Sequence, residues 1–236
     1  MDGTSNIRFA IVVTTYRKND KTKALLVKAL QSVLNQTYTN FKVFLIGDKY
    51  EDETEFLAIA RMIPIDRLYY RNLPIARERS KYPMDSEQLW SSGGVHSRNI
   101  GIDLALSEGF DYICHLDHDD YWHEQHLELI NHTIKLTNNA SFIFTCATYF
   151  NSYLPSVKLT NEIIEMKPEP CKLIHSSVCV NHREIPLRYR DVYAEEGKIY
   201  AADADMWDRV SEYITEHNLK SYLITSLTCF HPTERN

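Results

Sequence analysis

Two aspartates separated by one residue follow an apolar run near the middle of the chain. Asp117 and Asp119 flank His118 directly after the run YICHL. Side chains two residues apart on an extended segment point to the same side, so both carboxylates can reach one site. Mg²⁺ and Mn²⁺ prefer such oxygen ligands and keep coordination positions free for phosphate oxygens. The alternative is an acidic turn that caps the next helix, because aspartate is a favoured N-cap residue.

A second acidic pair stands before a tryptophan late in the chain. Asp203 and Asp205 precede Met206 and Trp207 at the predicted start of a helix. An aspartate has a reference pKa of about 3.9, so it is ionised at neutral pH and can accept a proton from a hydroxyl group as a general base. Carboxylates at a helix start also complement the helix dipole. The sequence leaves both interpretations open.

Basic and histidine side chains provide further candidates. Arg98 lies in a predicted helix that begins with Gly93-Gly94, where a ligand can approach the backbone and an arginine can pair with phosphate. His231 and Arg235 follow the last predicted strand. Four histidines crowd around the first acidic run, but no cysteine joins them at a zinc-site spacing, so zinc is disfavoured. They are His115, His118, His123 and His126.

The elements that must position these residues alternate between strand and helix patterns. The predicted strands are 8–14, 41–46, 67–70 and 111–116, and the predicted helices are 21–36, 51–61, 94–107 and 124–136. This alternation predicts an α/β fold with a mostly parallel sheet covered by helices on both faces. After Ser141 we expect a mixed half, with strand-like segments 142–150, 171–180 and 187–193, a helix over 203–217, and a last strand or strand pair over 221–230. We expect one domain over 1–236, with halves of about 7–120 and 121–236.

Ligands of open parallel sheets bind outside the carboxyl ends of the strands. The polar residues that follow the first, second and fourth strands should therefore face one crevice, although they lie far apart in the sequence. The segment 71–89 is long for a connection and contains two prolines and three arginines. Such a segment is either functional or a solvated surface loop.

Composition narrows the class of protein. The 236 residues carry a net charge of −6, which argues against binding to a nucleic-acid backbone. The chain contains no run of about 18 apolar residues, so we expect no membrane-spanning helix. Its first residues are polar, so we expect no signal peptide. The five cysteines lack CxxC spacing, so we expect reduced thiols in a cytoplasmic protein, with peripheral membrane association left open.

Five ordered segments resemble the family 2 glycosyltransferases, which are inverting enzymes of the GT-A fold. They are IVVTTYRKN, FKVFLIGDKYED, GGVHSRNIGIDLAL, FDYICHLDHDDYWHEQHLELI and AADADMWDRV. Together they cover nearly the whole chain in the family's order. The resemblance implies transfer of a sugar from a nucleotide-sugar donor to a hydroxyl of a glycan or other acceptor. In this family the nucleotide is most often UDP. It also implies Mn²⁺ or Mg²⁺ as cofactor.

The same resemblance implies residue roles. The nucleotide-sugar pocket would include Thr14, Tyr16, Arg17, Asp48, Arg98, Asp117, His118 and Arg235. The metal ligands would be Asp119, the more direct one, with Asp117 and His231. The family base stands four residues before the tryptophan, which gives Asp203. This chain has Ala202 where the family has a glutamate, so Asp205 remains a rival.

Other functions stay possible at this point. The missing glutamate keeps open a catalytically silent module that only binds nucleotides. An aspartyl phosphotransferase is disfavoured because its acidic motif would follow the first strand. A sugar-nucleotide pyrophosphorylase would need glycines after the first strand, and residues 14–20 contain none. The motifs leave the sugar, the acceptor and the oligomeric state undetermined.

Overall fold

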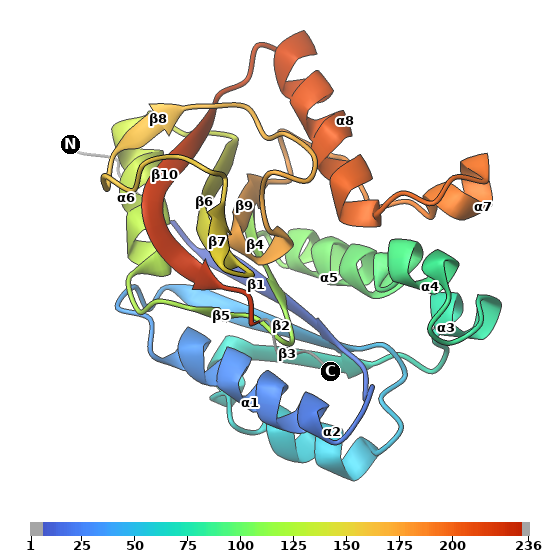
Figure 1. The fold of residues 1–236 in the computed structure, drawn as a ribbon. Helices are drawn as coiled ribbons and strands as arrows, with labels where there is room; N and C mark the ends of the chain where they lie inside the picture. Colours follow the sequence, from blue (N-terminus) through green and yellow to red (C-terminus); the bar gives the residue numbers. More distant parts are fainter. Residues whose placement is uncertain (1–6, 233–236) are drawn as a thin grey trace.

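The computed structural model describes residues 7–232, and its centre is a single twisted sheet (Figure 1). The strands found there are β1 (Phe9–Thr15), β2 (Phe41–Gly47), β3 (Leu68–Asn72), β4 (Tyr112–Asp117), β5 (Tyr121–Trp122), β6 (Phe142–Tyr149), β7 (Ser152–Leu154), β8 (Ile163–Glu165), β9 (Val178–Asn181) and β10 (Ser221–Phe230). The main order is β3-β2-β1-β4-β9-β6-β10-β5, with β7 beside β6 and β8 beside β10.

The first half of the sheet is parallel, as its sequence predicts. Strands β3, β2, β1 and β4 pair in parallel, and Thr14 lies opposite Ile46 on one side and Asp117 on the other. All seven side chains of β1 are buried. A strand buried on both faces reads as a continuous apolar run, which explains the sequence FAIVV. The register brings the ends of β1, β2 and β4 to the same edge.

The second half is mixed, also as expected. β9 runs antiparallel to both β4 and β6, while β10 is parallel to β6. Strands β6 and β10 therefore point in the same direction as β1, and their carboxyl ends reach the same edge. Two details of the prediction are wrong. Segment 187–193 contains no strand and leads into helix α7 (Val192–Glu196), and residues His175–Ser177 form a 3-10 turn, η2, before β9.

Helices cover both faces of the sheet, which confirms the predicted layering (Figure 1). On one face α1 (Lys21–Leu34), α2 (Glu53–Ala60) and α6 (His126–Leu136) contribute buried apolar side chains. On the other face α5 (Val95–Ser107) and α8 (Ala202–Glu216) do so. Within residues 7–232, none of the helices has the length and apolar character needed to cross a membrane.

The arginine-rich connection between β3 and α5 is folded rather than an open loop. It contains α3 (Arg77–Lys81) and α4 (Glu87–Ser92), and a 3-10 turn, η1 (Ile65–Arg67), lies just before β3. The Lys81 ammonium and the Tyr82 hydroxyl both donate to the Asp191 carboxylate, at 2.9 and 2.7 Å. Helix α4 packs against α7. These contacts fix the segment over one end of the sheet.

Candidate active site

A cleft of about 530 Å³ opens at the carboxyl ends of β1, β2 and β4. Its walls also include α4, the start of α5 and the start of α8. Eight of the residues predicted from sequence lie on its walls: Thr14, Tyr16, Asp48, Arg98, Asp117, His118, Asp119 and Asp203. Residues up to about 190 positions apart in the chain thus share one cavity, as the rule for parallel sheets requires.

One end of the cleft is built by Asp48, Arg79 and Tyr16. Arg79 Nε donates to Asp48 Oδ2 at 3.2 Å, and Arg79 Nη2 donates to the Asp48 carbonyl oxygen. The Arg79 guanidinium carbon lies 4.8 Å from the centre of the Tyr16 ring. The arginine therefore fixes an acid and an aromatic ring on neighbouring strand ends, and a stacked, charge-paired arginine is held more firmly than a lysine would be.

Asp48 keeps one oxygen available for a ligand. Its side chain is buried, and Oδ1 has no hydrogen-bond partner among the described residues. Burial raises the pKa of the Asp48 carboxyl above its ordinary value, and the Arg79 contact opposes that rise. Because an unpaired buried acceptor is costly, this oxygen is suited to accept from an N–H group that enters the cleft.

The middle of the cleft is built by Arg98 and Asp117. Arg98 Nη2 donates to Asp117 Oδ1 at 2.9 Å, and Arg98 Nη1 donates to the Gly93 carbonyl at 3.2 Å. Gly94 begins α5 with φ +81°, a conformation that favours glycine. A Cβ at Gly101 would lie 2.4 Å from Val12 Cγ1, so glycine lets α5 lie directly on β1. This close packing brings Arg98 to the end of β4.

Behind Asp117 lies a buried aromatic group. His175 Nε2 is 3.9 Å from Asp117 Oδ1, and His175 Nδ1 is 3.2 Å from the Tyr189 hydroxyl. Burial lowers the pKa of His175 to about 4, so the ring is neutral at pH 7. Asn99 exchanges two hydrogen bonds with the Tyr189 backbone, at 2.8 and 2.9 Å, and so ties the segment before α7 to α5.

The carboxylates suit a hard divalent cation. Asp119 lines the cleft beside His118, whose ring lies 5.9 Å from the Tyr16 ring. Within residues 7–232 no three His, Cys, Asp or Glu side chains are grouped to enclose a metal ion. Mg²⁺ and Mn²⁺ do not need such an enclosure, because one or two carboxylates and substrate phosphates are their usual ligands. The donor set therefore fits a cation that binds together with a diphosphate.

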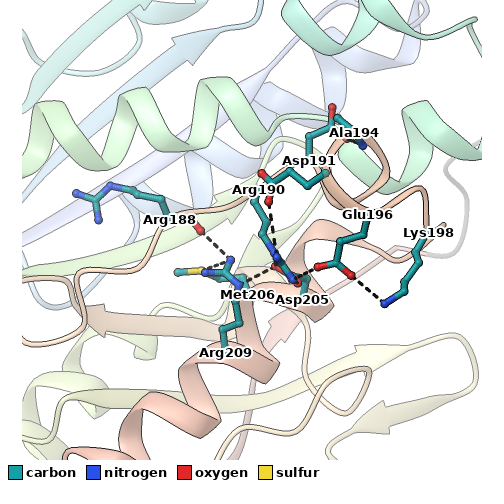
Figure 2. Close-up of polar contacts among 10 residues, drawn as sticks. Arg188, Arg190, Asp191, Ala194, Glu196, Lys198, Asp205, Met206 and Arg209 are labelled. Atoms are coloured by element: carbon teal, nitrogen blue, oxygen red, sulfur yellow. Dashed lines mark hydrogen bonds and ion pairs between the residues drawn. The ribbon is translucent and has the colours of Figure 1, made fainter.

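The two aspartates before Trp207 lie in different environments. Asp203 lines the cleft, and its Oδ1 accepts from the Ala204 N–H at 2.9 Å. Asp205 is buried and turns away toward two arginines, as Figure 2 shows. Arg190 and Arg209 both donate to its carboxylate, at 2.6–3.0 Å. Asp205 is thus held in a network of ion pairs outside the cleft lining.

Two predicted site residues, Arg17 and His231, are not among the residues that line the cleft. Arg17 pairs with Asp20 at the surface, at 3.3 Å. The imidazole of His231 lies 2.9 Å from Asp120, beside the acidic run but paired with the neighbour of Asp119. Pairing of β10 with β5 brings it there, since Phe230 lies opposite Tyr121. Arg235 falls outside the described residues.

Sequence reasoning missed Arg79 and the buried group behind Asp117. Arg79 was one of three arginines in a segment with two possible interpretations, and no pattern in the sequence distinguished it from the other two. Lys18 and Asn19 also line the cleft, in place of Arg17. His175 and Tyr189 follow from tertiary packing alone, because neither stands in a motif of recognisable spacing.

Comparison with curated proteins identifies the family. A protein of Acanthamoeba polyphaga mimivirus, named an uncharacterized glycosyltransferase, is 35% identical over an alignment of 240 positions that covers 98% of this chain and 96% of that protein. The chain belongs to the glycosyltransferases. The amylovoran biosynthesis glycosyltransferase AmsB of Erwinia amylovora is 30% identical over 123 residues, 52% of this chain and 34% of AmsB. No family model matches the chain.

Solved structures support a GT-A-like fold for this glycosyltransferase. The S. aureus protein TarS in complex with UDP-GlcNAc superposes with a TM-score of 0.68 over 98% of this chain, at 14% identity. The mannosyltransferase PcManGT from Pyrobaculum calidifontis, in complex with GDP-Man and Mn²⁺, superposes with a TM-score of 0.63 at 13% identity. The chain spans 59% of each of these two structures. At these identities the similarity concerns the fold.

Proposed function

We propose that this glycosyltransferase is an inverting enzyme of the family 2 type that transfers a sugar from a nucleoside diphosphate donor, a UDP-sugar, to a hydroxyl group of an acceptor. The observation that carries the proposal is the arrangement of the cleft. An N–H acceptor, Asp48, lies at one end, an acidic run at the end of β4 lies in the middle, and the carboxylate of Asp203 shares the same cavity. The bound nucleotide sugars of TarS and PcManGT are consistent with it.

The nucleotide base would occupy the end formed by Asp48, Arg79 and Tyr16. Uracil presents one ring N–H in the plane of the base, and the open Oδ1 of Asp48 can accept it. The adjoining Tyr16 ring supplies an apolar surface, which Arg79 stiffens through its 4.8 Å contact. Thr14 lies beside this end on β1 and lines the cleft wall.

The diphosphate would lie over the acidic run, between Arg98 and Asp119. Asp119 would hold Mn²⁺ or Mg²⁺, with Asp117 nearby, and the cation would offset negative charge on the departing diphosphate. Arg98 Nε is buried without a partner among the described residues, so a phosphate or sugar oxygen can accept from it. The Arg98–Asp117 pair, at 2.9 Å, would keep both groups preorganised for the charge that develops in the transition state.

Asp203 would serve as the base. Its carboxylate would take the proton of the acceptor hydroxyl while the hydroxyl oxygen forms a bond to the anomeric carbon and the bond to the diphosphate breaks. One displacement inverts the configuration at that carbon. Asp205 is unsuited to this role because two arginines already occupy its oxygens.

A donor panel tests the proposal. Release of the nucleoside diphosphate is measured with Mn²⁺ and with EDTA, in wild type and in Asp119→Ala; it is UDP for UDP-glucose, UDP-galactose and UDP-GlcNAc, and GDP for GDP-mannose. We expect metal-dependent turnover of a UDP-sugar that Asp119→Ala lowers at least a hundredfold, together with loss of metal-dependent UDP binding. Binding of UDP without turnover of any donor would support a nucleotide-binding module instead, and unchanged turnover in Asp119→Ala would refute the metal assignment.

A further inference from the structure

Two large apolar side chains stand exposed at the rim of the cleft. Trp90, on α4, is 70% exposed, and Met84 is 56% exposed, and both line the cavity that contains Asp203. The other two tryptophans of the chain, Trp122 and Trp207, are only 3% and 1% exposed. Single exposed apolar residues are common on proteins. Here, however, a pair of them borders a polar cavity.

Trp90 is held firmly in this position. The Ser86 side-chain oxygen accepts from the Leu89 N–H at 3.1 Å, which caps α4, and the Trp90 N–H donates to the Ser86 carbonyl at 3.0 Å. Leu89, the preceding residue, is buried, while Trp90 lies on the solvent side of α4. Helix α4 also packs against α7. The backbone that carries the indole is therefore held in place, which lowers the ordering cost of a contact with a ligand.

The packing of α4 against α7 links Trp90 to the Asp203 side of the cleft. The nucleotide end is formed by the ends of β1 and β2 and by Arg79 of α3. Helix α4 packs on α7 as well as on α3, and the chain runs from α7 through residues 197–201 to the start of α8, which contains Asp203. Figure 1 shows α4 and α7 close together at the end of the molecule where α5 begins.

The chemistry around Trp90 is that of a carbohydrate site. Asp85, Ser86 and Ser91 line the same cavity; Asp85 offers a carboxylate, the Ser86 oxygen also accepts from the Leu89 N–H, and the hydroxyl of the buried Ser91 donates to the Gln88 carbonyl. A pyranose has the complementary surface, with an apolar face of C–H bonds and a rim of hydroxyl groups. Its weakly positive C–H hydrogens are attracted by the negative face of an aromatic ring. A purely apolar ligand would leave the Asp85 carboxylate without a polar group to pair with.

We propose that Trp90, with Met84 beside it, is a stacking subsite for a pyranose ring of the acceptor, so that the acceptor is a carbohydrate. The proposal rests on the function proposed above, because it assumes that Asp203 receives the acceptor hydroxyl. Ile75, in the same segment, is 61% exposed but does not line the cleft. A membrane-binding patch of these three residues is therefore the less favoured occupant and becomes an outcome of the test.

Binding to an array of immobilised glycans with pyranose termini tests the subsite without turnover. Full-length wild type, Trp90→Phe and Trp90→Ala are compared in the presence of UDP and Mn²⁺, with Ile65→Ala as the control for loss of an exposed apolar side chain elsewhere. We expect wild type, Trp90→Phe and Ile65→Ala to bind the same class of glycan, and the signal of Trp90→Ala to fall at least tenfold. Equal UDP affinity of the variants, measured by calorimetry, verifies that the nucleotide end is intact.

Tryptophan emission supplies a direct readout. Since Trp122 and Trp207 are buried, the glycan selected on the array should shift the emission of wild type but not that of Trp90→Phe. The proposal is overturned if wild type binds no glycan or if Trp90→Ala binds glycans as well as wild type. Binding to phosphatidylglycerol vesicles is measured in parallel, and the proposal is also overturned if Trp90→Ala loses only this vesicle binding. The function proposed above fails separately, by an absence of UDP release from every donor in wild type.

Discussion

Arg190 donates hydrogen bonds to the Asp205 carboxylate from two nitrogen atoms. Nε lies 2.9 and 3.0 Å from the two carboxylate oxygens, and Nη2 lies 2.6 Å from Oδ1 (Figure 2). Arg209 Nε adds a contact of 2.9 Å from the same helix, and Glu196 lies 2.9 Å from Arg190 Nη2. Bidentate pairing of this kind fixes orientation as well as charge. Asp205 thus joins the start of α8 to the segment that leads into α7.

Substitution of the two aspartates before Trp207 should separate catalysis from stability. Asp203→Asn should lower the rate of sugar transfer at least about a thousandfold, because the amide cannot take a proton. The fold and UDP binding should persist. Asp205→Ala should instead lower the free energy of unfolding by about 2–3 kcal/mol, because it leaves the partly buried Arg190 and Arg209 without their shared partner. Urea unfolding and UDP release measure the two effects.

Asp208→Asn is the matched control for both changes, since Asp208 is exposed on the same helix. It should alter neither stability nor transfer by a measurable amount. If Asp205→Asn stopped transfer while its unfolding free energy stayed at the wild-type value, the base would have to be reassigned to Asp205.

Arg79 should control nucleotide binding. Arg79→Ala removes the partner of Asp48 and the cation above the Tyr16 ring, so we expect the Kd for UDP to rise at least tenfold. Arg79→Lys should recover only part of that loss, because the single nitrogen of an ammonium group cannot reproduce the hydrogen bonds that Nε and Nη2 of Arg79 donate to Asp48. Arg77→Ala changes an exposed arginine of the same helix and should leave the Kd unchanged. Isothermal calorimetry with UDP and Mn²⁺ makes the comparison, and equal Kd values for Arg79→Ala and Arg77→Ala would contradict the assignment.

Much of the sheet and one side of the cleft could be predicted from sequence, because both depend on local patterns. The buried run of β1 and the period of α1 each indicate one element, and strand ends of a parallel sheet meet at one edge. That rule predicts that Thr14, Asp48 and Asp117 lie together, and all three line the cleft. Their specific roles remain predictions.

The rest depended on contacts between distant segments. The choice between Asp203 and Asp205 depends on Arg190, which pairs with Asp205. Arg190 lies in segment 187–193, which the sequence predicts as a strand and the structure shows without one. The role of Arg79 required α3 to fold over β2, and a five-residue helix gives little periodic signal. His231 was expected at Asp119 and lies at Asp120, a difference of one residue that the pairing of β10 with β5 decides.

Gly101 should be intolerant of a side chain. A Cβ at this position would lie 2.4 Å from Val12 Cγ1, so Gly101→Ala forces α5 away from β1 and shifts Arg98 with it. We expect a loss of about 1–3 kcal/mol in the free energy of unfolding and weaker UDP binding. The double variant Val12→Ala, Gly101→Ala removes the clashing methyl groups and should bind UDP more tightly than Gly101→Ala alone. If the double variant bound no better, the clash with Val12 would not be the cause.

Two buried histidines should make stability fall as the solution becomes more acidic. Burial lowers the pKa of His126 to about 3 and that of His182 to about 3, against about 6.5 for an exposed imidazole. Below pH 6.5 the unfolded chain binds protons that the native chain does not bind until about pH 3, so stability present above pH 6.5 is lost through this window. Each histidine contributes a slope of up to about 1.4 kcal/mol per pH unit.

Urea unfolding at a series of pH values from 5.0 to 7.5 measures this slope before most carboxylates titrate. His126→Gln should reduce the slope by up to about 1.4 kcal/mol per pH unit, the contribution of one proton, because the glutamine cannot titrate in either state. His132→Gln is the matched control, since His132 is exposed on the same helix α6 and is solvated in both states. A wild-type stability that did not change between pH 5.0 and 6.5, or an equal slope in His126→Gln, would show that the imidazole of His126 is protonated in the native protein.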